Sequence, residues 1–294
     1  PMIKIGDSLY NWSNVKSTQS LGFSENEGEF DFLPTVTWQC SDLKFITGVT
    51  SNGEANKNSI LDISYKFENH SEKPLDFEFY LLIRPFQVNP YYQFLNLTGG
   101  VGKINSVNAE NGRSIFIDDK VVLPQKMYDS FGAAVFDEGN IVDLLRKGNM
   151  PQRKTVEDKS GLANGVIKYL FHLNAGENTE FFVVVPYYGG ESIFNNLNAE
   201  NVSEGFNEAT DFWKTKVGHI KFNLPESADR IVNTYKSNLA YILINRDKAA
   251  IQPGSRSYER SWIRDGALTS SALLKYGIVT EVKDFIELYT DNQY

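Results

Sequence analysis

The first two thirds of the chain alternate short apolar runs with turn-forming residues, and this pattern restricts the fold most strongly. Several turns carry Asn or Gly, among them 111–112 and 174–176, because these residues tolerate the left-handed backbone. Short strands at this spacing are typical of packed antiparallel sheets. The sequence therefore predicts a large antiparallel β-sandwich. Its candidate strands are 30–39, 43–49, 60–68, 77–88, 113–117, 131–136, 165–173 and 181–187.

Residues 60–67 show the alternation of a strand most clearly. One face carries Leu61, Ile63, Tyr65 and Phe67, and the other carries Ile60, Asp62, Ser64 and Lys66. A period of two predicts that the first face is buried and that the second faces solvent. Segments 79–86 and 181–188 are instead apolar on both faces, which we expect of strands inside a two-layer sandwich.

From residue 199 the apolar residues recur at helical spacing. This pattern predicts a connecting helix up to about 217, an extended segment at 219–224 and a second helix that ends near 247. A third helix is predicted from about 265 to 276, where Gly277 ends it, and another over 279–289. We place the domain boundary at 222, so that 1–222 forms the sandwich and 223–294 the helical part.

Charge and composition exclude several classes of function. The 294 residues carry a net charge of −8, and clustered Lys and Arg for binding nucleic acid are absent from the sequence. The single cysteine, Cys40, excludes an internal disulfide framework and is expected to be a buried small hydrophobe. Because no apolar run approaches the roughly 18 residues of a membrane span, we expect no membrane partner.

Standard catalytic and cofactor motifs are incomplete or absent in the sequence. The segment at 97–105 resembles a phosphate loop, but Leu97 stands where glycine is needed and Ile104 replaces the Ser or Thr. His70, His172 and His219 lie far apart without ligand spacing, and no Gly-x-Ser-x-Gly elbow occurs. We therefore expect neither a metal nor a cofactor.

The segment 252–277 combines groups that recognise sugars. Planar charged groups bind neighbouring hydroxyls in pairs, and aromatic rings stack on the apolar faces of sugar rings. Tyr258, Trp262, Arg264 and Asp265 supply both kinds of group within eight residues. Each also has a simpler interpretation: Asp265 as a helix N-cap, Arg264 as a partner of Glu259 or of a helix end, and the two rings as core.

The same segment resembles the start of the catalytic barrel in six-hairpin glycosidases, the clan of glucoamylases, glucan phosphorylases and trehalases. The resemblance rests on Trp262-Ile263-Arg264-Asp265, which looks like the aromatic-x-Arg-Asp signature near the first inner helices of that barrel. Segments 32–39 and 80–93 look like the β-supersandwich that precedes the barrel in bacterial members. The resemblance implies a supersandwich followed by a linker helix and the first helices of an incomplete α/α barrel.

Functional roles follow from this resemblance. It implies that Arg264 and Asp265 bind hydroxyls of a carbohydrate substrate, with Trp262 and Tyr258 as walls. The carboxylates that act as acid and base are expected beyond Tyr294, so no catalytic residue is assigned here. The chain is then the amino-terminal portion of a glycoside hydrolase, inactive by itself, with the remaining barrel as its partner. A periplasmic or extracellular location is favoured over a cytoplasmic one.

Three other interpretations stay open. An inverting phosphorylase uses phosphate where an inverting hydrolase uses a base about 6.5–9.5 Å from the acid, and the sequence does not separate the two. A non-catalytic sandwich that binds a glycan or a partner protein would use its helices only as a scaffold. A structural sandwich without a ligand would need Arg264 only for stability.

Overall fold

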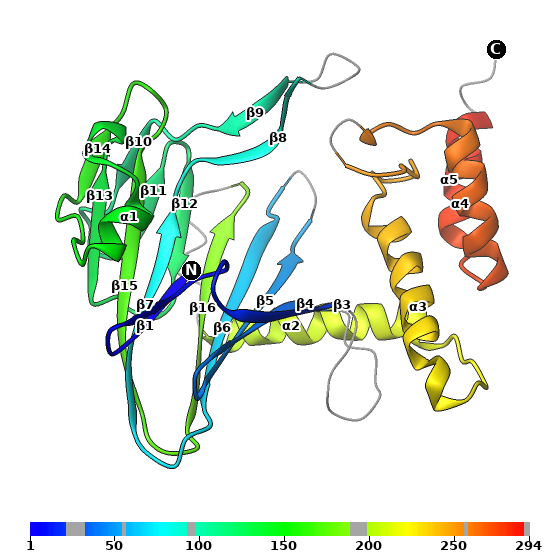
Figure 1. Ribbon diagram of the computed structural model, residues 1–294. Helices are drawn as coiled ribbons and strands as arrows, with labels where there is room; N and C mark the ends of the chain where they lie inside the picture. Colours follow the sequence, from blue (N-terminus) through cyan, green and yellow to red (C-terminus); the bar gives the residue numbers. More distant parts are fainter. Residues whose placement is uncertain (22–32, 55–56, 93–97, 189–198, 256–257, 291–294) are drawn as a thin grey trace. The chain divides into compact units, whose positions relative to one another are not determined.

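The computed structural model of the protein describes residues 1–21, 33–54, 57–92, 98–188, 199–255 and 258–290. Contacts between Cα atoms divide the chain into two units (Figure 1). The first contains residues 1–20, 33–88 and 101–209, and the second contains residues 21–32, 89–100 and 210–294. The domain boundary at residue 222 remains a prediction.

The first unit is built on two large sheets whose described strand pairs are antiparallel. The five-stranded sheet has the order β13 (Ser130–Ala134), β15 (Asn164–Leu173), β7 (Leu75–Ile83), β1 (Met2–Ile5) and β2 (Ser8–Tyr10). The nine-stranded sheet has the order β14 (Thr155–Glu157), β10 (Ser106–Asn108), β11 (Ile115–Ile117), β12 (Lys120–Pro124), β16 (Asn178–Pro186), β6 (Ile60–Asn69), β5 (Leu43–Asn52), β4 (Pro34–Cys40) and β3 (Lys16–Leu21). A further pair joins β8 (Phe86–Tyr92) to β9 (Thr98–Gly102).

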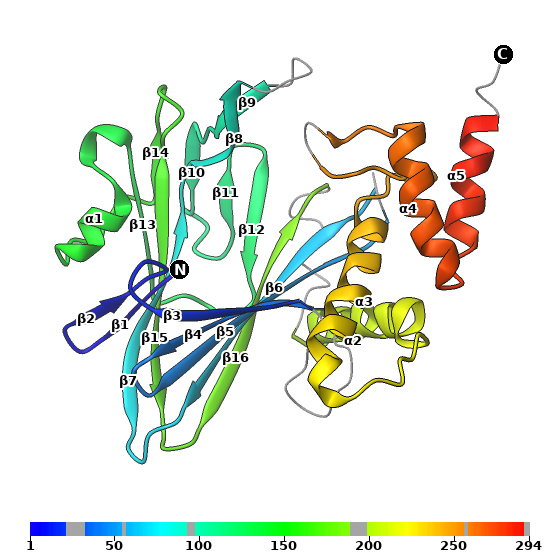
Figure 2. The same ribbon diagram turned by 45° about the vertical axis from the view of Figure 1, so that its right-hand side comes forward.

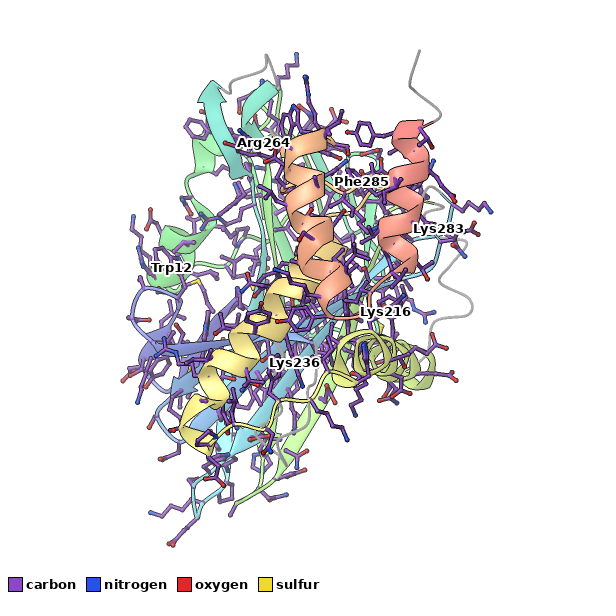
Figure 3. All side chains as sticks on the ribbon, turned by 90° about the vertical axis from the view of Figure 1, so that its right-hand side faces the viewer. Trp12, Lys216, Lys236, Arg264, Lys283 and Phe285 are labelled. Atoms are coloured by element: carbon purple, nitrogen blue, oxygen red, sulfur yellow. The ribbon has the colours of Figure 1, made fainter. Side chains whose placement is uncertain are left out.

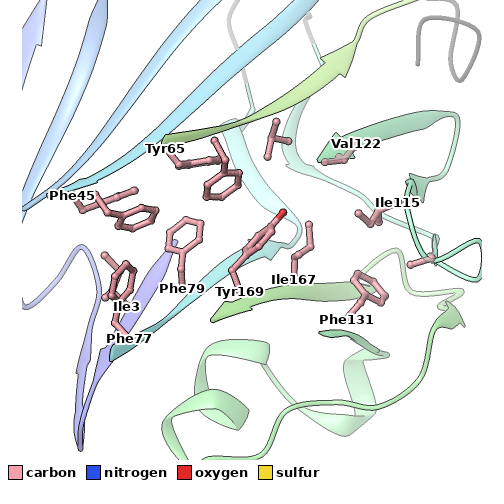
Figure 4. Packing of buried hydrophobic residues seen from close by; sticks show 14 of the residues in the cluster. Ile3, Phe45, Tyr65, Phe77, Phe79, Ile115, Val122, Phe131, Ile167 and Tyr169 are labelled. Carbon is pink, nitrogen blue, oxygen red and sulfur yellow. The ribbon is translucent and has the colours of Figure 1, made fainter. Parts of the chain in front are cut away.

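Aromatic side chains from the two sheets form the main core (Figure 4). The ring centroids of Phe45 and Phe79, which come from opposite sheets, lie 5.5 Å apart, and those of Tyr169 and Phe181 lie 4.7 Å apart at an angle of 44°. Such tilted contacts suit the ring quadrupoles and bury large apolar areas. The predicted order of a large antiparallel β-sandwich followed by helices is confirmed. Cys40 is fully buried, as predicted.

The prediction for the outer face of β6 was wrong. Tyr65 and Phe67 point into the core, but Asp62 and Ser64 are also buried, although they were expected to face solvent. The cause is α2 (Ala199–Trp213), whose residues Val202 and Phe206 pack over this face of the sheet (Figure 1). Leu61, predicted to be buried, is 38% exposed.

The segments that are apolar on both faces have helices as well as a second sheet to cover them. In β16, Phe181 faces the core between the sheets, whereas Phe182 packs with Phe206 of α2. In β7, Tyr80 packs with Ile141 of α1 (Ile141–Arg146). The two-layer interpretation was therefore incomplete, because each sheet has a helix on its outer face.

The predicted strands agree with the structure in most cases. The segment predicted at 77–88 is divided into β7 and β8 at Arg84 and Pro85. The predicted strand at 30–39 corresponds to β4 from residue 34, and its residues 30–32 lie outside the described residues. The short strands β1, β2, β3, β9, β10, β12 and β14 and the helix α1 were not predicted.

The second unit is helical and has its own core. After α2, the chain forms a π-helical turn at Lys214–Gly218, then α3 (Asp229–Ile244), α4 (Ile263–Lys275) and α5 (Thr280–Thr290) (Figure 2). Residues 219–224, predicted to be extended, form no described strand. Leu239, Leu273, Val282 and Phe285 are among the buried residues of this core. The helices predicted from periodicity are therefore present, with boundaries shifted by a few residues.

Candidate functional site

The start of α4 positions the predicted sugar-binding residues. Trp262 has the extended backbone of an N-cap (φ −113°, ψ 140°), and its carbonyl oxygen accepts a 2.8 Å hydrogen bond from the N–H of Gly266. The helix thus begins at Ile263, two residues before the predicted start. The interpretation of Asp265 as the N-cap was wrong, because Asp265 is the third residue of the helix.

Arg264 and Asp265 form an ion pair at the beginning of this helix. The distance between Arg264 Nη2 and Asp265 Oδ2 is 3.6 Å. The Arg264 side chain is 84% exposed, while that of Asp265 is 29% exposed. Asp265 lies in the first turn, where unpaired backbone N–H groups and the helix dipole favour a carboxylate. A guanidinium and a carboxylate at this spacing offer donors and acceptors side by side to one ligand.

Two aromatic rings border the ion pair. Tyr258 is 51% exposed, and its ring meets that of Trp262 edge-on at a centroid distance of 6.1 Å. All four predicted residues line one open hollow of about 660 Å³, together with Ser261, Ile263 and Tyr289. Arg264 and Asp265 are therefore accessible to a ligand. This volume falls within the about 300–1,000 Å³ of small-molecule sites.

Tyr289 is a site residue that the sequence did not indicate. Its hydroxyl donates to the Ser261 carbonyl oxygen at 2.8 Å and lies 3.1 Å from Ser261 Oγ. Ser261 Oγ donates in turn to the carbonyl oxygen of Ile251. This connection joins α5 to the segment that carries Tyr258 and Trp262. Local periodicity marks Tyr289 only as part of a helix, so no sequence signal assigned it to the site.

Close packing holds together α4 and α5, the two helices that contribute residues to the hollow. Gly266 is buried, and the ring of Phe285 lies in the space that a larger side chain would occupy (Figure 3). The small residues of α4 thus include one that close helix packing requires. Lys216 forms an ion pair with the buried Glu281 of α5, and Arg246 Nη2 lies 3.2 Å from Asp284 Oδ2.

Charged partners set the pKa of Glu281. Burial raises this pKa, but the hydrogen bond from Lys216 and the charges of Lys216 and Arg246 outweigh burial. The pKa therefore lies below its ordinary value, and the carboxylate form is stabilised.

Metal-ligand clusters are absent among the residues that the structure describes. The three histidines lie with other partners: His172 Nδ1 is 2.7 Å from Asp76, His70 Nε2 is 3.2 Å from Glu68, and His219 approaches two backbone carbonyl oxygens. In the described part of the chain, no helix is long and apolar enough to cross a membrane.

Comparison with known proteins adds little at the level of sequence. No protein-family model matches the chain, and no curated protein matches it. Among solved structures, the chain is similar to one described as "Putative kojibiose phosphorylase from human microbiome", with 10% identity and a TM-score of 0.37. The match covers 81% of this chain but only 30% of that protein. A likeness at this level carries no assignment of function.

Proposed function

We propose that the chain is the amino-terminal portion of a carbohydrate-active enzyme, a glycoside hydrolase that acts on an oligosaccharide or polysaccharide. One observation carries the proposal: an exposed guanidinium, a neighbouring carboxylate and two aromatic rings border the same open hollow. Sugars are bound by this combination of paired polar groups and apolar ring faces.

Within this proposal, each residue has a defined role. Arg264 donates hydrogen bonds to two neighbouring hydroxyls, and Asp265 accepts from a third. Trp262 and Tyr258 form the wall against which the apolar face of the sugar ring packs. These residues bind substrate, and acid and base catalysis is assigned to none of them. Residues 223–294 are then a linker helix and the beginning of an α/α barrel, preceded by a supersandwich at 1–222.

A phosphorylase reaction would use the same hollow. In an inverting phosphorylase, phosphate attacks the anomeric carbon in place of a water activated by a base. Arg264 and Asp265 would hold the sugar in either reaction. The two are separated by assaying turnover of the full-length protein with and without phosphate, since only the phosphorylase requires it.

A non-catalytic binding module is the second candidate function. The observation in its favour is that Asp265 is the only carboxylate among the described residues that line the hollow, whereas hydrolysis uses a pair. This candidate retains the sugar-binding role of Arg264 and removes the reaction. A partner protein in place of a glycan would bind through the same exposed groups.

The test is a glycan panel with matched variants. Wild-type protein is expected to bind a subset of oligosaccharides, and Arg264→Ala and Asp265→Asn are expected to weaken binding by about tenfold or more, as lost charge-assisted hydrogen bonds do. Arg260→Ala and Glu259→Gln are the controls, because these exposed neighbours do not line the hollow. Equal loss in the controls, or no binding by wild type, contradicts a sugar site here. Turnover of a glycan by these residues alone would refute the purely substrate-binding role.

A further inference from the structure

A second hollow, of about 180 Å³, lies in the first unit. It forms where the residues that follow β7, the 3-10 turn at Phe136–Glu138 and the start of β15 come together. Arg84, Phe136 and Asn164 line it. These residues are 28 to 80 positions apart in the sequence (136 to 164 and 84 to 164), so the fold alone brings them together.

Asn164, which lines the hollow, carries an unpaired acceptor. Its side-chain Nδ2 donates to the Leu162 carbonyl oxygen at 3.4 Å, whereas its Oδ1 is buried without a hydrogen-bond partner among the described residues. A flipped amide would place Oδ1 against the Leu162 carbonyl, so the hydrogen bond favours the orientation observed. The residue is 6% exposed. Because a buried unpaired acceptor costs free energy, a donor that enters the hollow would stabilise it.

Arg84 and Phe136 supply the other two groups. Arg84 is exposed and forms no hydrogen bond or ion pair with the residues that the structure describes. Phe136 is 58% exposed, and its backbone N–H donates to Asp158 Oδ2 at 2.6 Å, which holds the turn in place. Asn140 also borders the hollow, but its Oδ1 already accepts from the N–H of Val142. Among the described side chains that line the hollow, Asn164 therefore carries the buried acceptor without a partner.

These groups discriminate between classes of ligand. A metal cation is disfavoured beside the Arg84 guanidinium, and a fully deprotonated anion such as chloride or sulfate offers no donor to Asn164 Oδ1. Hydrogen phosphate carries an O–H but has no apolar face to pack on Phe136. A purely apolar molecule would leave both polar groups without a partner. A hydroxyl both donates and accepts, so a molecule with several hydroxyls serves both groups. The volume is below the about 300–1,000 Å³ of sites for drug-sized ligands, which limits the ligand to about one ring.

We propose that this hollow binds a single sugar ring. One or two hydroxyls accept hydrogen bonds from Arg84, another donates to Asn164 Oδ1, and the apolar face of the ring packs on Phe136. The site uses residues of the first unit alone and does not depend on the function proposed for Arg264. The protein then has two places for carbohydrate, one in each unit.

Saturation-transfer NMR of the whole chain with glucose, galactose, mannose and xylose tests this proposal, with inorganic phosphate as the comparison probe. At least one sugar is expected to receive saturation at millimolar concentration. Arg84→Gln and Phe136→Ala are expected to weaken its binding by about tenfold, while both exposed positions leave folding intact. Asn164→Leu tests the acceptor, with a thermal melt to verify the fold.

Matched controls make the result decisive. Arg113→Gln and Tyr187→Ala change an arginine and an exposed aromatic of the same unit outside the hollow, and unchanged sugar binding is expected for both. The proposal is overturned if no sugar binds, if phosphate binds at Arg84 and the sugars do not, or if Arg84→Gln binds sugar as wild type does. In the last case, a loss on Arg264→Ala would support the site on α4 and not this one.

Discussion

A Cβ atom placed on Gly266 would lie only 2.0 Å from Cζ of Phe285, so the close approach of α4 and α5 requires a glycine here. Real Cβ atoms do not come this near to another heavy atom, and Gly266→Ala would force the Phe285 ring or the helix to move. We expect this variant to lose about 1–3 kcal/mol of stability, the usual cost of overpacking a core. Urea denaturation followed by circular dichroism measures the loss.

Gly218→Ala is the control for this experiment, because the added Cβ would lie 3.8 Å from Lys214 Cβ, an ordinary contact. Phe285→Leu should reduce the cost of Gly266→Ala, since the smaller side chain frees space. An equal loss for the two glycines, or no effect of Phe285→Leu on the cost, would show that the contact is not the cause.

The ion pair of Lys216 with Glu281 predicts loss of stability in acid. The pKa of Glu281 lies below its ordinary value of 4.5, so its contribution is complete above that pH and is lost as the pH falls through the lower, folded-state pKa. Lys216→Met leaves a buried carboxylate without its partner and is expected to cost about 1–3 kcal/mol near neutral pH. Lys283→Met is the control, because its pair with Glu287 is exposed and worth at most about 0.5 kcal/mol. Unfolding midpoints across the acid range measure both, and parallel curves for the two variants would contradict the prediction.

For Asp62 we predict that stability depends on pH in the opposite direction. Burial raises its pKa above the ordinary value of 3.8, and the hydrogen bond from Asn52 Nδ2 only partly offsets this. The folded state therefore keeps its proton to higher pH than the unfolded state, and stability declines as the pH rises from about 3.8 through the folded-state pKa. Asp62→Asn keeps an acceptor for Asn52 without the charge, so it should gain stability relative to wild type as the pH is raised. The exposed Asp7→Asn is the control, and a constant difference between Asp62→Asn and wild type at all pH values would refute the effect.

Cys40 is expected to be unreactive in the folded protein. Burial raises the pKa of its thiol to about 12, which leaves almost no thiolate at neutral pH, and its side chain is inaccessible to solvent. Labelling by iodoacetamide should therefore require global unfolding. Its rate should be slow in buffer and fast in urea. Mass spectrometry of the labelled protein measures the rates. Rapid labelling without denaturant would mean that β4 opens locally.

The two faces of β6 show which kind of burial local periodicity predicts and which kind it misses. Tyr65 and Phe67 were placed in the core correctly, because alternation within one strand is enough to define an apolar face. Asp62 was misplaced because its cover, α2, comes from a segment more than a hundred residues later (62 to 199). Very short strands such as β10 and β14 depend on pairing with distant neighbours and carry too few residues for a clear pattern.

The same contrast applies to the two hollows. Tyr258, Trp262, Arg264 and Asp265 could be grouped from sequence because they are close along the chain, and they do line one hollow. Tyr289 could not be added, since its contact with Ser261 depends on how α5 packs. The hollow of Arg84, Phe136 and Asn164 has no sequence signature, because three distant segments form it.

Tyr289 should affect the site on α4 by positioning its wall. Tyr289→Phe removes the hydroxyl that binds Ser261, which lies between Tyr258 and Trp262, and should cost about 0.5–1.5 kcal/mol of stability. If the proposed sugar site is correct, the less constrained rings should also weaken glycan binding several-fold, since misplaced contacts lose binding energy. Tyr241→Phe, a partly exposed tyrosine of α3 outside the hollow, is the control. Calorimetric titration with a glycan that binds wild type measures affinity, and urea unfolding measures stability. Reduced stability with unchanged affinity for the glycan would mean that Tyr289 supports only the fold. If Arg264→Ala loses affinity in that case and Tyr289→Phe does not, the sugar site stands and its geometry is set by α4 itself.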